Sequence, residues 1–376
     1  MDSQDSRKLM PSPARQLPPT IAMGGGTFEL VAAGSTSAGS TPAGLAADGS
    51  SAPRRHPEWI KAPIPSGETY QDLRRLLHGL NLNTVCEEAH CPNMGECWGE
   101  RTATVMILGD ICTRACGFCA VKTGKPLVHD LGEPRRVAEA IRGLGLDHVV
   151  ITSVARDDLD DGGAGIFADT IRRLRVACPD MGVEVLIPDF NGEEEPLRTV
   201  MAAAPEILNH NVETVARLQK PVRKRARYDR SLGVLLRAKA YARELGSPAV
   251  HTKSSIMVGL GETRPELHQT FLDLRAVDCD ILTLGQYLRP SPEHLPVERY
   301  YHPDEFAEMR DEALALGFKH VESGPLVRSS YHARDQVPGA EARRAAREAG
   351  VAGAARSPIR LAPAIDPDGR VVYRPD

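Results

Sequence analysis

Three cysteines, Cys112, Cys116 and Cys119, stand close together in the spacing CxxxCxxC. In so short a segment, all three thiolates can converge on one ion or cluster. A zinc ion needs a fourth ligand to complete its tetrahedron, and the next candidate, His129, lies well downstream. A cubane iron–sulfur cluster can be held by three cysteines, which leaves one iron open to an outside ligand. Because thiolate-rich sites select iron–sulfur clusters or zinc, the spacing favours a cluster, with zinc and a distant fourth ligand as the alternative.

A second group of three cysteines, Cys86, Cys91 and Cys97, precedes the first in the run CEEAHCPNMGEC. It also lacks an obvious fourth ligand, since His90 is adjacent to Cys91 and badly placed to share its metal. The group predicts a second cluster, with a zinc knuckle as the alternative. The two remaining cysteines stand alone at the ends of helical patterns and are predicted to be plain buried thiols.

The composition is that of a soluble globular protein. The chain has 376 residues, of which 41% are hydrophobic and 26% charged, with a formal net charge of -4. That charge gives no general attraction to nucleic acid or anionic lipid, and no apolar run approaches the ~20 residues that span a bilayer. The N-terminus mixes acids with bases and has no apolar core behind them, which argues against a secretory signal. We therefore expect a cytoplasmic protein, in which clustered cysteines favour metal over disulfides.

The chain divides into four parts. Residues 1–55 are dominated by alanine, glycine, serine, threonine and proline, and are predicted to be disordered because they cannot bury enough apolar surface. Residues 56–101 contain a predicted helix at 67–82 and the second cysteine group. Residues 102–335 form the main domain, and residues 336–376, rich in alanine and arginine and then in proline, are predicted to be a peripheral tail.

Within the main domain, short apolar runs alternate with amphipathic helical stretches. The predicted strands are residues 102–108, 148–154, 183–188, 206–211, 251–259 and 281–288. This alternation predicts parallel strands joined by right-handed crossovers, and therefore an α/β fold of six βα units. Six units are fewer than the eight of a full barrel, which leaves a partial barrel or a doubly wound sheet. In either architecture, ligands bind at the carboxyl ends of the strands.

The first cysteine group, with Phe118 as a cofactor-binding residue before its last cysteine, resembles the signature of the radical S-adenosylmethionine superfamily. The runs CEEAHCPNMGECW and GDICTRACGFCAV, with RSSYHA at 328–333, resemble the lipoyl synthase family more narrowly, across residues 57–335. The resemblance implies a partial (βα)6 TIM-like barrel of the radical S-adenosylmethionine type, with an N-terminal cluster-binding extension and a C-terminal extension. It also implies two [4Fe-4S] clusters, one of which binds S-adenosylmethionine through its open iron.

The resemblance also assigns the ligands of the two clusters. The cysteines of residues 112–119 hold the cluster that binds S-adenosylmethionine, and the cysteines of residues 86–97 hold the auxiliary cluster. In the family, a serine of the RSSYHA motif is the fourth ligand of the auxiliary cluster, and we assign it to Ser330 rather than Ser329. An Arg-Ser-Ser-Tyr run would otherwise be interpreted as an ordinary loop, so this assignment depends on the resemblance.

The family's reaction inserts two sulfur atoms, at C6 and C8, into an octanoyl chain held on a lysine of a lipoyl carrier domain. It is the final step of lipoyl cofactor biosynthesis. No side-chain base can take a proton from those unactivated C–H bonds, whereas a 5′-deoxyadenosyl radical can abstract the hydrogen atom. The resemblance implies two molecules of S-adenosylmethionine per product, and an auxiliary cluster that is dismantled as the sulfur donor.

The same resemblance implies the partners. The substrates are octanoylated lipoyl domains of 2-oxoacid dehydrogenase complexes or the H protein of glycine cleavage. An electron donor such as ferredoxin or flavodoxin and an iron–sulfur carrier that rebuilds the cluster are also implied, with no nucleic acid and no membrane. The family expectation is a monomer.

Further candidate site residues lie where the predicted strands end. Thr152 and Ser153 close the second strand, where the superfamily contacts the methionyl amine. Asn211 and Glu213 follow the fourth strand, in a segment that faces S-adenosylmethionine in the family. Gly259 belongs to a run similar to the GxIxGxxE pattern that packs beside adenine.

Three other features lie near strand ends. The run ARDDLDDGG at 155–163 predicts a solvated acidic loop more readily than site carboxylates. His210 is equally well explained as a core histidine or as a functional one. Gln286, Tyr287 and Arg289 end the sixth strand and are expected at the mouth, where they could touch the carrier or the acyl chain.

The run KPVRKRARYDR at 220–230 holds six lysine or arginine residues against one aspartate. It predicts a solvated loop, a patch for nucleic acid, or a surface that attracts an acidic carrier domain. Two other functions remain as alternatives. One is another two-cluster radical enzyme, such as a methylthiotransferase or biotin synthase, and the other is a zinc-stabilised protein that binds RNA through the basic run.

Overall fold

The computed structural model describes residues 56–336, together with residues 361–365 and 371–375. Within the first range, the exceptions are residues 63–64, 66, 81, 90, 100–101, 128, 145, 147 and 248–249. The segment predicted to be disordered, residues 1–55, lies outside the described residues, as does most of the predicted tail.

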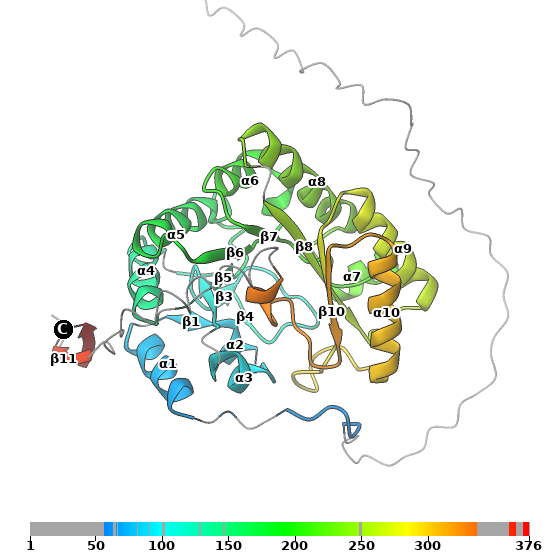
Figure 1. The fold of residues 1–376 in the computed structure, drawn as a ribbon, viewed down its shortest axis with the longest axis horizontal. Coiled ribbons are helices and arrows are strands. Elements are labelled where there is room, and N and C mark those ends of the chain that lie inside the picture. The colour runs from blue at the N-terminus through cyan, green and yellow to red at the C-terminus, as the bar shows by residue number, and fades with distance from the viewer. Residues whose placement is uncertain are drawn as a thin grey trace, which may run out of the picture. The chain divides into compact units, whose positions relative to one another are not determined.

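An eight-stranded sheet runs through the centre of the described chain and curves round on itself (Figure 1). Its strands, in order, are β1 (Asn83–Thr84), β2 (Thr104–Ile107), β5 (His148–Ser153), β6 (Gly182–Leu186), β7 (Ile207–Asn209), β8 (His251–Val258), β9 (Ile281–Gln286) and β10 (His320–Gly324). The strands from β2 to β10 are parallel to their neighbours, and β1 pairs antiparallel with β2 at one edge.

The strand order decides between the two predicted architectures. A doubly wound sheet reverses its direction of growth at a switch point. Here each parallel strand adds to the same side of the preceding one, from β2 through β10. The six predicted strands are all present, so the partial (βα)6 barrel is confirmed, with β10 as an additional parallel strand at its edge.

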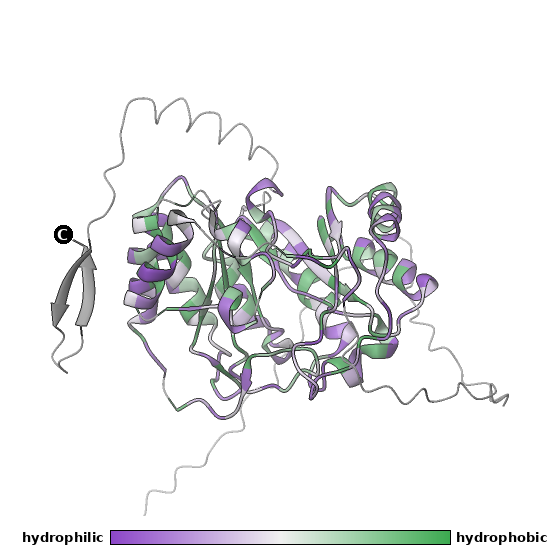
Figure 2. Ribbon diagram, turned by 90° about the horizontal axis from the view of Figure 1, so that it is seen from below, coloured by the Kyte–Doolittle hydropathy of each residue, from purple (hydrophilic) through white to green (hydrophobic). Residues whose placement is uncertain are grey.

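Helices cover the outside of the curved sheet, one after each of the strands from β2 to β9 (Figure 1). They are α4 (Glu133–Leu144), α5 (Ala164–Ala177), α6 (Glu194–Met201), α8 (Tyr228–Glu244), α9 (Arg264–Ala276) and α10 (Pro303–Ala315). Figure 2 shows hydrophobic residues along the strands and both hydrophobic and hydrophilic residues on the helices, as expected of amphipathic helices. In the described part of the chain, no helix is both long and apolar enough to cross a bilayer.

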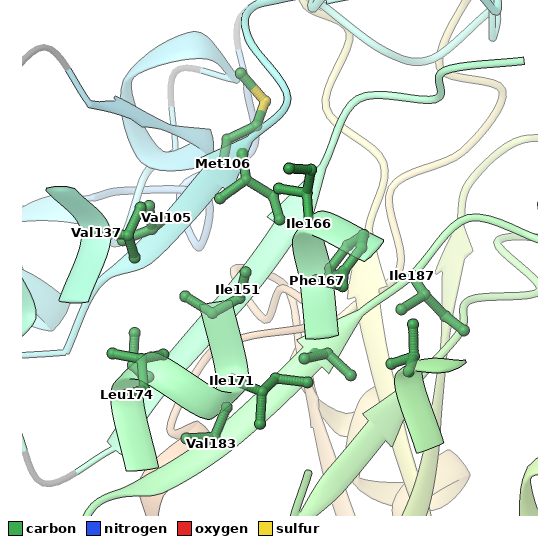
Figure 3. Packing of buried hydrophobic residues seen from close by; sticks show 14 of the residues in the cluster. Val105, Met106, Val137, Ile151, Ile166, Phe167, Ile171, Leu174, Val183 and Ile187 are labelled. Atoms are coloured by element: carbon green, nitrogen blue, oxygen red, sulfur yellow. The ribbon is translucent and has the colours of Figure 1, made fainter. Parts of the chain in front are cut away.

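The largest core lies between the first strands of the barrel and helices α4 and α5 (Figure 3). Ile151 of β5 and Val183 of β6 lie beside Phe167 and Ile171 of α5, and all four side chains are fully buried. Burying each such side chain stabilises the fold by about 1.5–3 kcal/mol. Side chains alternate along a strand, so the strand residues next to those that face the helices point into the interior of the barrel.

Three helices precede the barrel, and the second and third of them contain Cys86 and Cys97. They are α1 (Glu68–Gly79), α2 (Val85–Glu88) and α3 (Met94–Gly99). Tyr70, Leu73 and Leu77 lie on one face of α1 and are buried, which confirms the predicted helix. The Tyr70 ring stacks on Trp98 of α3 with the ring centroids 5.2 Å apart, so α1 anchors the cysteine segment.

Shorter elements complete the described fold. They are β3 (Ile111–Cys112), β4 (Lys122–Thr123), α7 (Gln219–Val222) and the 3-10 helices η1 (Phe190–Gly192), η2 (Ala216–Leu218) and η3 (Ala333–Asp335). In the predicted tail, β11 (Leu361–Ile365) and β12 (Val371–Pro375) pair antiparallel, which the sequence analysis did not anticipate. The missed signal is the turn-forming run Asp-Pro-Asp-Gly at 366–369, between two short apolar stretches.

Candidate metal centres

The loop of residues 112–119 lies at the carboxyl ends of the barrel strands. Its backbone donates hydrogen bonds to Ala155 O at 3.0 Å and to Val222 O at 2.9 Å, and it accepts one from the Leu295 N–H at 3.0 Å. These three residues follow β5, β7 and β9 in the chain. Parallel strands bring their following loops to one edge, so the cysteine loop is fixed at the predicted ligand-binding end of the barrel.

The three thiols of this loop are half-buried and interact with one another electrostatically. Burial raises the pKa of Cys116 to about 11 and that of Cys119 to about 12, and neighbouring thiols of the loop contribute to both shifts. The Cys112 sulfur accepts the N–H groups of Arg114 and Ala155 at 3.4 and 3.3 Å. Thiols whose pKa is raised in this way lose their protons only beside a strong positive charge, such as a bound metal cluster would supply.

The donor set of the loop suits a cluster better than a single ion. The cysteine ligands of a cubane each bind a different iron, so they stand farther apart than the ligands of one zinc ion. Three mutually close thiols therefore fit a cluster with one open iron.

A buried ion network fixes the cysteine loop through Arg114, which belongs to the loop. The Arg114 guanidinium contacts Asp157 and Asp189, each at 2.7 Å. Burial by itself raises the pKa of Asp189, but the hydrogen bond and charge of Arg114 prevail and lower it to about 2. Asp158 pairs in the same way with Arg156 at 2.9 Å. The predicted solvated acidic loop is therefore wrong for Asp157, because Arg114, distant in the chain, neutralises it in a largely buried pair. Asp158, Asp160 and Asp161 are exposed, as predicted.

Two of the predicted cofactor-binding residues have buried oxygen atoms without a hydrogen-bond partner. These atoms are Ser153 Oγ and Asn211 Oδ1. An unpartnered buried oxygen is costly unless a ligand satisfies it, so both fit a polar group of S-adenosylmethionine. Thr152 differs from its neighbour, because its hydroxyl donates to Leu186 O at 3.0 Å across the sheet. The structure thus leaves Ser153 free for a ligand and uses Thr152 to join two strands.

Glu213 lies beside the cysteine loop in an unusual backbone conformation. Its φ of 64° is in the left-handed region, which a residue with a side chain adopts at some cost. Its carboxylate accepts from Asn211 Nδ2 at 3.1 Å, and its charge contributes to the raised pKa of both Cys116 and Cys119. The structure therefore brings Asn211 and Glu213 together with the first cysteine group.

His210, next in the chain, belongs to the core. Its Nδ1 lies 2.9 Å from Ile187 O and its Nε2 lies 3.0 Å from Ser231 Oγ. Burial lowers the pKa of His210 to about 4, so the ring is neutral near pH 7. Of its two interpretations, the structure supports the satisfied core histidine.

Gly259 stands where no side chain fits. A Cβ there would lie 2.1 Å from Gln286 Nε2 and 2.5 Å from Arg299 O, and its φ is +100°. Gln286 donates to Arg299 O at 2.9 Å, and Tyr287 donates through its hydroxyl to Leu295 O at 2.8 Å. The predicted contact with the carrier is therefore wrong for these two buried side chains, whose polar groups support the chain after β9, whereas contact with the acyl chain stays a prediction.

Phe118 and Arg289, also predicted near the mouth, differ in their contacts. Phe118 is half-buried and packs beside an apolar cluster formed by Val222, Leu260 and Tyr287. Arg289 is exposed, and its Nε donates to His294 O at 2.9 Å within its own loop. Phe118 thus forms part of the apolar wall beside the cysteine loop.

The second cysteine group begins in α2, whose first turn is capped by Thr84 accepting from the Glu87 N–H at 3.2 Å. Cys86 is buried, and burial raises its pKa to about 11. The Cys91 N–H donates to Cys86 O at 2.9 Å, which folds the chain back on itself. Burial also raises the pKa of Cys91, while the charge of Arg328 lowers it. His90, the residue judged unsuitable as a ligand, lies outside the described residues.

The loop that carries Ser330 lies against this cysteine segment. Asn93 Nδ2 donates to Leu326 O at 2.6 Å across 233 residues of chain. The Tyr331 hydroxyl donates to the Glu96 carboxylate, at 3.0 and 3.1 Å from its two oxygens, across 235 residues. Ser330 therefore stands between two points of contact with the segment that holds Cys86, Cys91 and Cys97. Asn93 and Glu96 were missed by the sequence analysis, because nothing in the chain order points to their partners.

The two isolated cysteines are structural, largely as predicted. Cys279 is fully buried beside Asp280. Burial raises its pKa to about 12. Cys178 is half-buried at the C-terminal end of α5, where it packs against the main core. Neither lies in the cysteine groups described above.

The basic run is divided by the fold. Arg223 is buried and donates to Asn211 O at 2.9 Å, and Arg230 pairs with Asp189 at 3.2 Å. The Arg223 guanidinium therefore supports the site, and a fully solvated loop is wrong. The exposed cations of the run that remain at its surface are Lys220, Lys224, Arg225 and Arg227.

A partial barrel with three cysteines in a loop at its mouth defines a radical S-adenosylmethionine enzyme. The family model of the radical SAM superfamily matches residues 106–274. The model of the N-terminal domain of lipoyl synthase of the radical SAM family matches residues 32–91. The crystal structure of methylornithine synthase is similar over 68% of this chain and 82% of that chain, but its 14% identity and TM-score of 0.41 add nothing to the assignment.

Two similar relatives narrow the class to one family. The chain is 60% identical to the lipoyl synthase of Symbiobacterium thermophilum over 290 residues, which are 77% of this chain and 89% of the relative. It is 57% identical to the lipoyl synthase of Koribacter versatilis over 285 residues, which are 76% and 92% of the two chains. The chain therefore belongs to the lipoyl synthase family of sulfur-inserting enzymes, which use S-adenosylmethionine and [4Fe-4S] clusters. This membership excludes the RNA-binding alternative and the other two-cluster enzymes.

Proposed function

We propose that the cysteines of residues 112–119 hold the cluster that binds S-adenosylmethionine, and that the cysteines of residues 86–97 hold a sacrificial cluster with Ser330 as fourth ligand. Together they insert sulfur at C6 and C8 of an octanoyl chain on a lysine of a lipoyl domain. The observation that carries this proposal is the contact of the Ser330 loop with the second cysteine group, through Tyr331 and Glu96.

The bound cluster and S-adenosylmethionine supply the carbon radical that abstracts a hydrogen atom from an unactivated C–H bond. The chain itself binds, orients and excludes water. Ser153 Oγ and Asn211 Oδ1 offer two unpartnered oxygens to the amino and hydroxyl groups of S-adenosylmethionine. Glu213 fixes the Asn211 amide, and Gly259 leaves room for close packing where any side chain would collide.

A serine suits a cluster that is taken apart. An alkoxide is a harder ligand than a thiolate and is more readily replaced at iron, so it holds the cluster without making it permanent. The three cysteines of the segment would then retain the remaining iron while sulfur leaves. Ser330 is half-buried, which is consistent with a site that admits a substrate.

The test uses an octanoylated lysine peptide, S-adenosylmethionine and a reductant under anaerobic conditions. The proposal expects a mass gain of two sulfur atoms for the wild-type enzyme. Ser330→Ala should lose most of this product while still cleaving S-adenosylmethionine, whereas the matched variant Ser329→Ala should retain it. Full product from Ser330→Ala, or loss only in Ser329→Ala, would refute the choice of serine.

We also propose that the exposed cations of the basic run attract an acidic lipoyl domain. Arg223 is unsuitable for testing this surface, because it is buried and its loss would disturb the site. Lys220→Glu and Lys224→Glu alter exposed cations. They should weaken binding of the octanoylated domain severalfold at low salt and little at high salt, because salt screens exposed charges. Equal affinity of the variants and the wild type at low salt would exclude this surface.

The cytoplasmic location, the ferredoxin or flavodoxin donor and the iron–sulfur carrier belong to the same proposal. A cluster that is consumed must be rebuilt, and the thiols left after its loss survive best in a reducing compartment. Pull-down of the anaerobic enzyme with a candidate donor or carrier, before and after turnover, tests them. A carrier should bind the enzyme more tightly after turnover, when the sacrificial cluster is depleted.

A further inference from the structure

Side chains gather at the rim where the Ser330 loop meets the second cysteine group. The Tyr331 hydroxyl donates to both oxygens of Glu96, at 3.0 and 3.1 Å. The His332 ring stacks on the Tyr331 ring with centroids 3.8 Å apart, and its Nε2 lies 3.5 Å from the same Glu96 carboxylate. One carboxylate of the cysteine segment thus contacts the side chains of two consecutive residues of the loop.

The backbone of the loop is shaped for this contact. His332 has a φ of 51°, in the left-handed region that a residue with a side chain adopts only when its surroundings reward it. Its Nδ1 lies 3.6 Å from Glu322 of β10, so the ring is held from the barrel side as well. Gln336 donates to Tyr331 O at 2.7 Å and fixes the loop after the contact.

The opposite side of the loop has a second attachment. Asn93 is buried, and its side-chain amide donates to Leu326 O at 2.6 Å. The two attachments come from residues on either side of Met94, and they hold the loop before and after Ser330. Ser330 is therefore held near the cysteines by hydrogen bonds from the cysteine segment itself, independent of any metal.

We propose that Glu96 and Tyr331 form a latch that positions Ser330 at the auxiliary cluster. The inference depends on the proposed role of Ser330 as a ligand. A single serine oxygen that exchanges readily at iron stays bound only if the loop that carries it is already ordered. An unattached loop would lose conformational entropy each time the serine binds. Glu96 and Tyr331 do not bind iron; they keep the serine within reach of it.

The latch is exposed enough to open without unfolding the domain. The Glu96 side chain is 40% exposed, and both of its partners reach it at the surface. Removing the Tyr331 hydroxyl should therefore leave the barrel intact and change only the closure of the loop. The readout is the rate at which the auxiliary cluster loses iron to a chelator.

The experiment compares Tyr331→Phe and Glu96→Ala with the wild type, each reconstituted anaerobically. All are made in a background in which Cys112, Cys116 and Cys119 are alanine, so that bound iron reports on the second cluster alone. Loss of the hydrogen bond should speed release of iron to the chelator about fivefold to tenfold in both variants. Glu96→Gln should restore a rate near that of the wild type, because its amide oxygen still accepts from the Tyr331 hydroxyl.

Tyr300→Phe is the matched control. Its hydroxyl lies 3.1 Å from the His56 ring, another contact between distant parts of the chain, but away from the cysteines. Equal iron release from Tyr331→Phe and Tyr300→Phe would overturn the latch. If Ser330→Ala itself leaves iron release unchanged, the ligand assignment fails instead, so the two failures are distinguishable. Should Glu96→Ala not fold, Tyr331→Phe, which removes a single oxygen atom, still decides the question.

Discussion

The two cysteine groups are held in different ways. The loop of residues 112–119 is fixed by backbone hydrogen bonds to the segments that follow β5, β7 and β9, and by the buried contacts of Arg114 with Asp157 and Asp189. The segment of residues 86–97 is anchored by α1 on one side and closed on the other by side chains of a loop from the end of the barrel. One site is built into the barrel mouth, and the other is assembled from two ends of the domain.

This difference matches the two proposed roles. A cluster that acts in every turnover needs ligands in a constant geometry, which buried ion pairs and backbone hydrogen bonds provide. A cluster that donates sulfur must be reached by substrate and then rebuilt, so one wall of its site has to open. Side-chain hydrogen bonds at a surface open at a smaller free-energy cost than a buried ion network.

Removing one cysteine from each group should separate the two roles most strongly. Cys116→Ala should abolish cleavage of S-adenosylmethionine, and with it all product, because no radical forms. Cys86→Ala should abolish sulfur insertion while still releasing 5′-deoxyadenosine. The measurement is mass spectrometry of both products from one anaerobic reaction. Sulfur insertion by Cys86→Ala at the wild-type rate would remove the distinction between the sites.

Breaking the ion network should destabilise the barrel more than any change at an exposed pair. Arg114→Met leaves the buried Asp189 carboxylate with less compensation, and we expect a loss of about 3–5 kcal/mol in the free energy of unfolding. The control Arg75→Met breaks an exposed pair with Asp72 and should cost less than about 1 kcal/mol. Urea unfolding of both variants measures the difference. Similar losses would show that the network is not a principal support.

The same network predicts a dependence of stability on pH. The folded-state pKa of Asp189 is lowered to about 2, below its unfolded value near 4, so its contribution is present above pH 4 and is lost as pH falls toward 2. The contribution is of order 2 kcal/mol. Asp189→Asn should therefore show a weaker loss of stability across this interval than the wild type, in unfolding followed at several pH values. Parallel curves would contradict the assignment.

Two adjacent hydroxyls should give the smallest and most specific effects. Thr152→Val loses the hydrogen bond to Leu186 O and should lower the free energy of unfolding by about 1 kcal/mol, with little change in KM for S-adenosylmethionine. Ser153→Ala removes an oxygen without a protein partner, so stability should stay within about 0.5 kcal/mol while KM rises severalfold. The opposite pattern would exchange the roles of the two residues.

Local sequence information was sufficient for the strands, most helices and both cysteine groups. Strand–helix alternation gave six βα units, because side-chain period changes from 2 to 3.6 within a few residues. Local sequence information failed where the interaction partners of a residue are distant in the chain. In the sequence, Asp157 cannot be told from a solvated acid, because its partner Arg114 is distant in the chain. Likewise Gln286 cannot be told from a site residue, although its amide donates to Arg299 O in the fold. Such contacts depend on the curvature of the sheet, which no local pattern contains.

The sequence by itself determined which chemistry the chain can support, because thiol spacing restricts the metals that a short loop can hold. It also determined the family, through runs of residues around those thiols. Only the tertiary structure decided how the two groups differ. It placed the Ser330 loop against Cys91 and Glu96 across more than half of the chain, and it buried Arg114 of the other cysteine loop against Asp157 and Asp189. The curvature of a partial barrel brings distant segments together, and that juxtaposition is a property of the fold rather than of any segment.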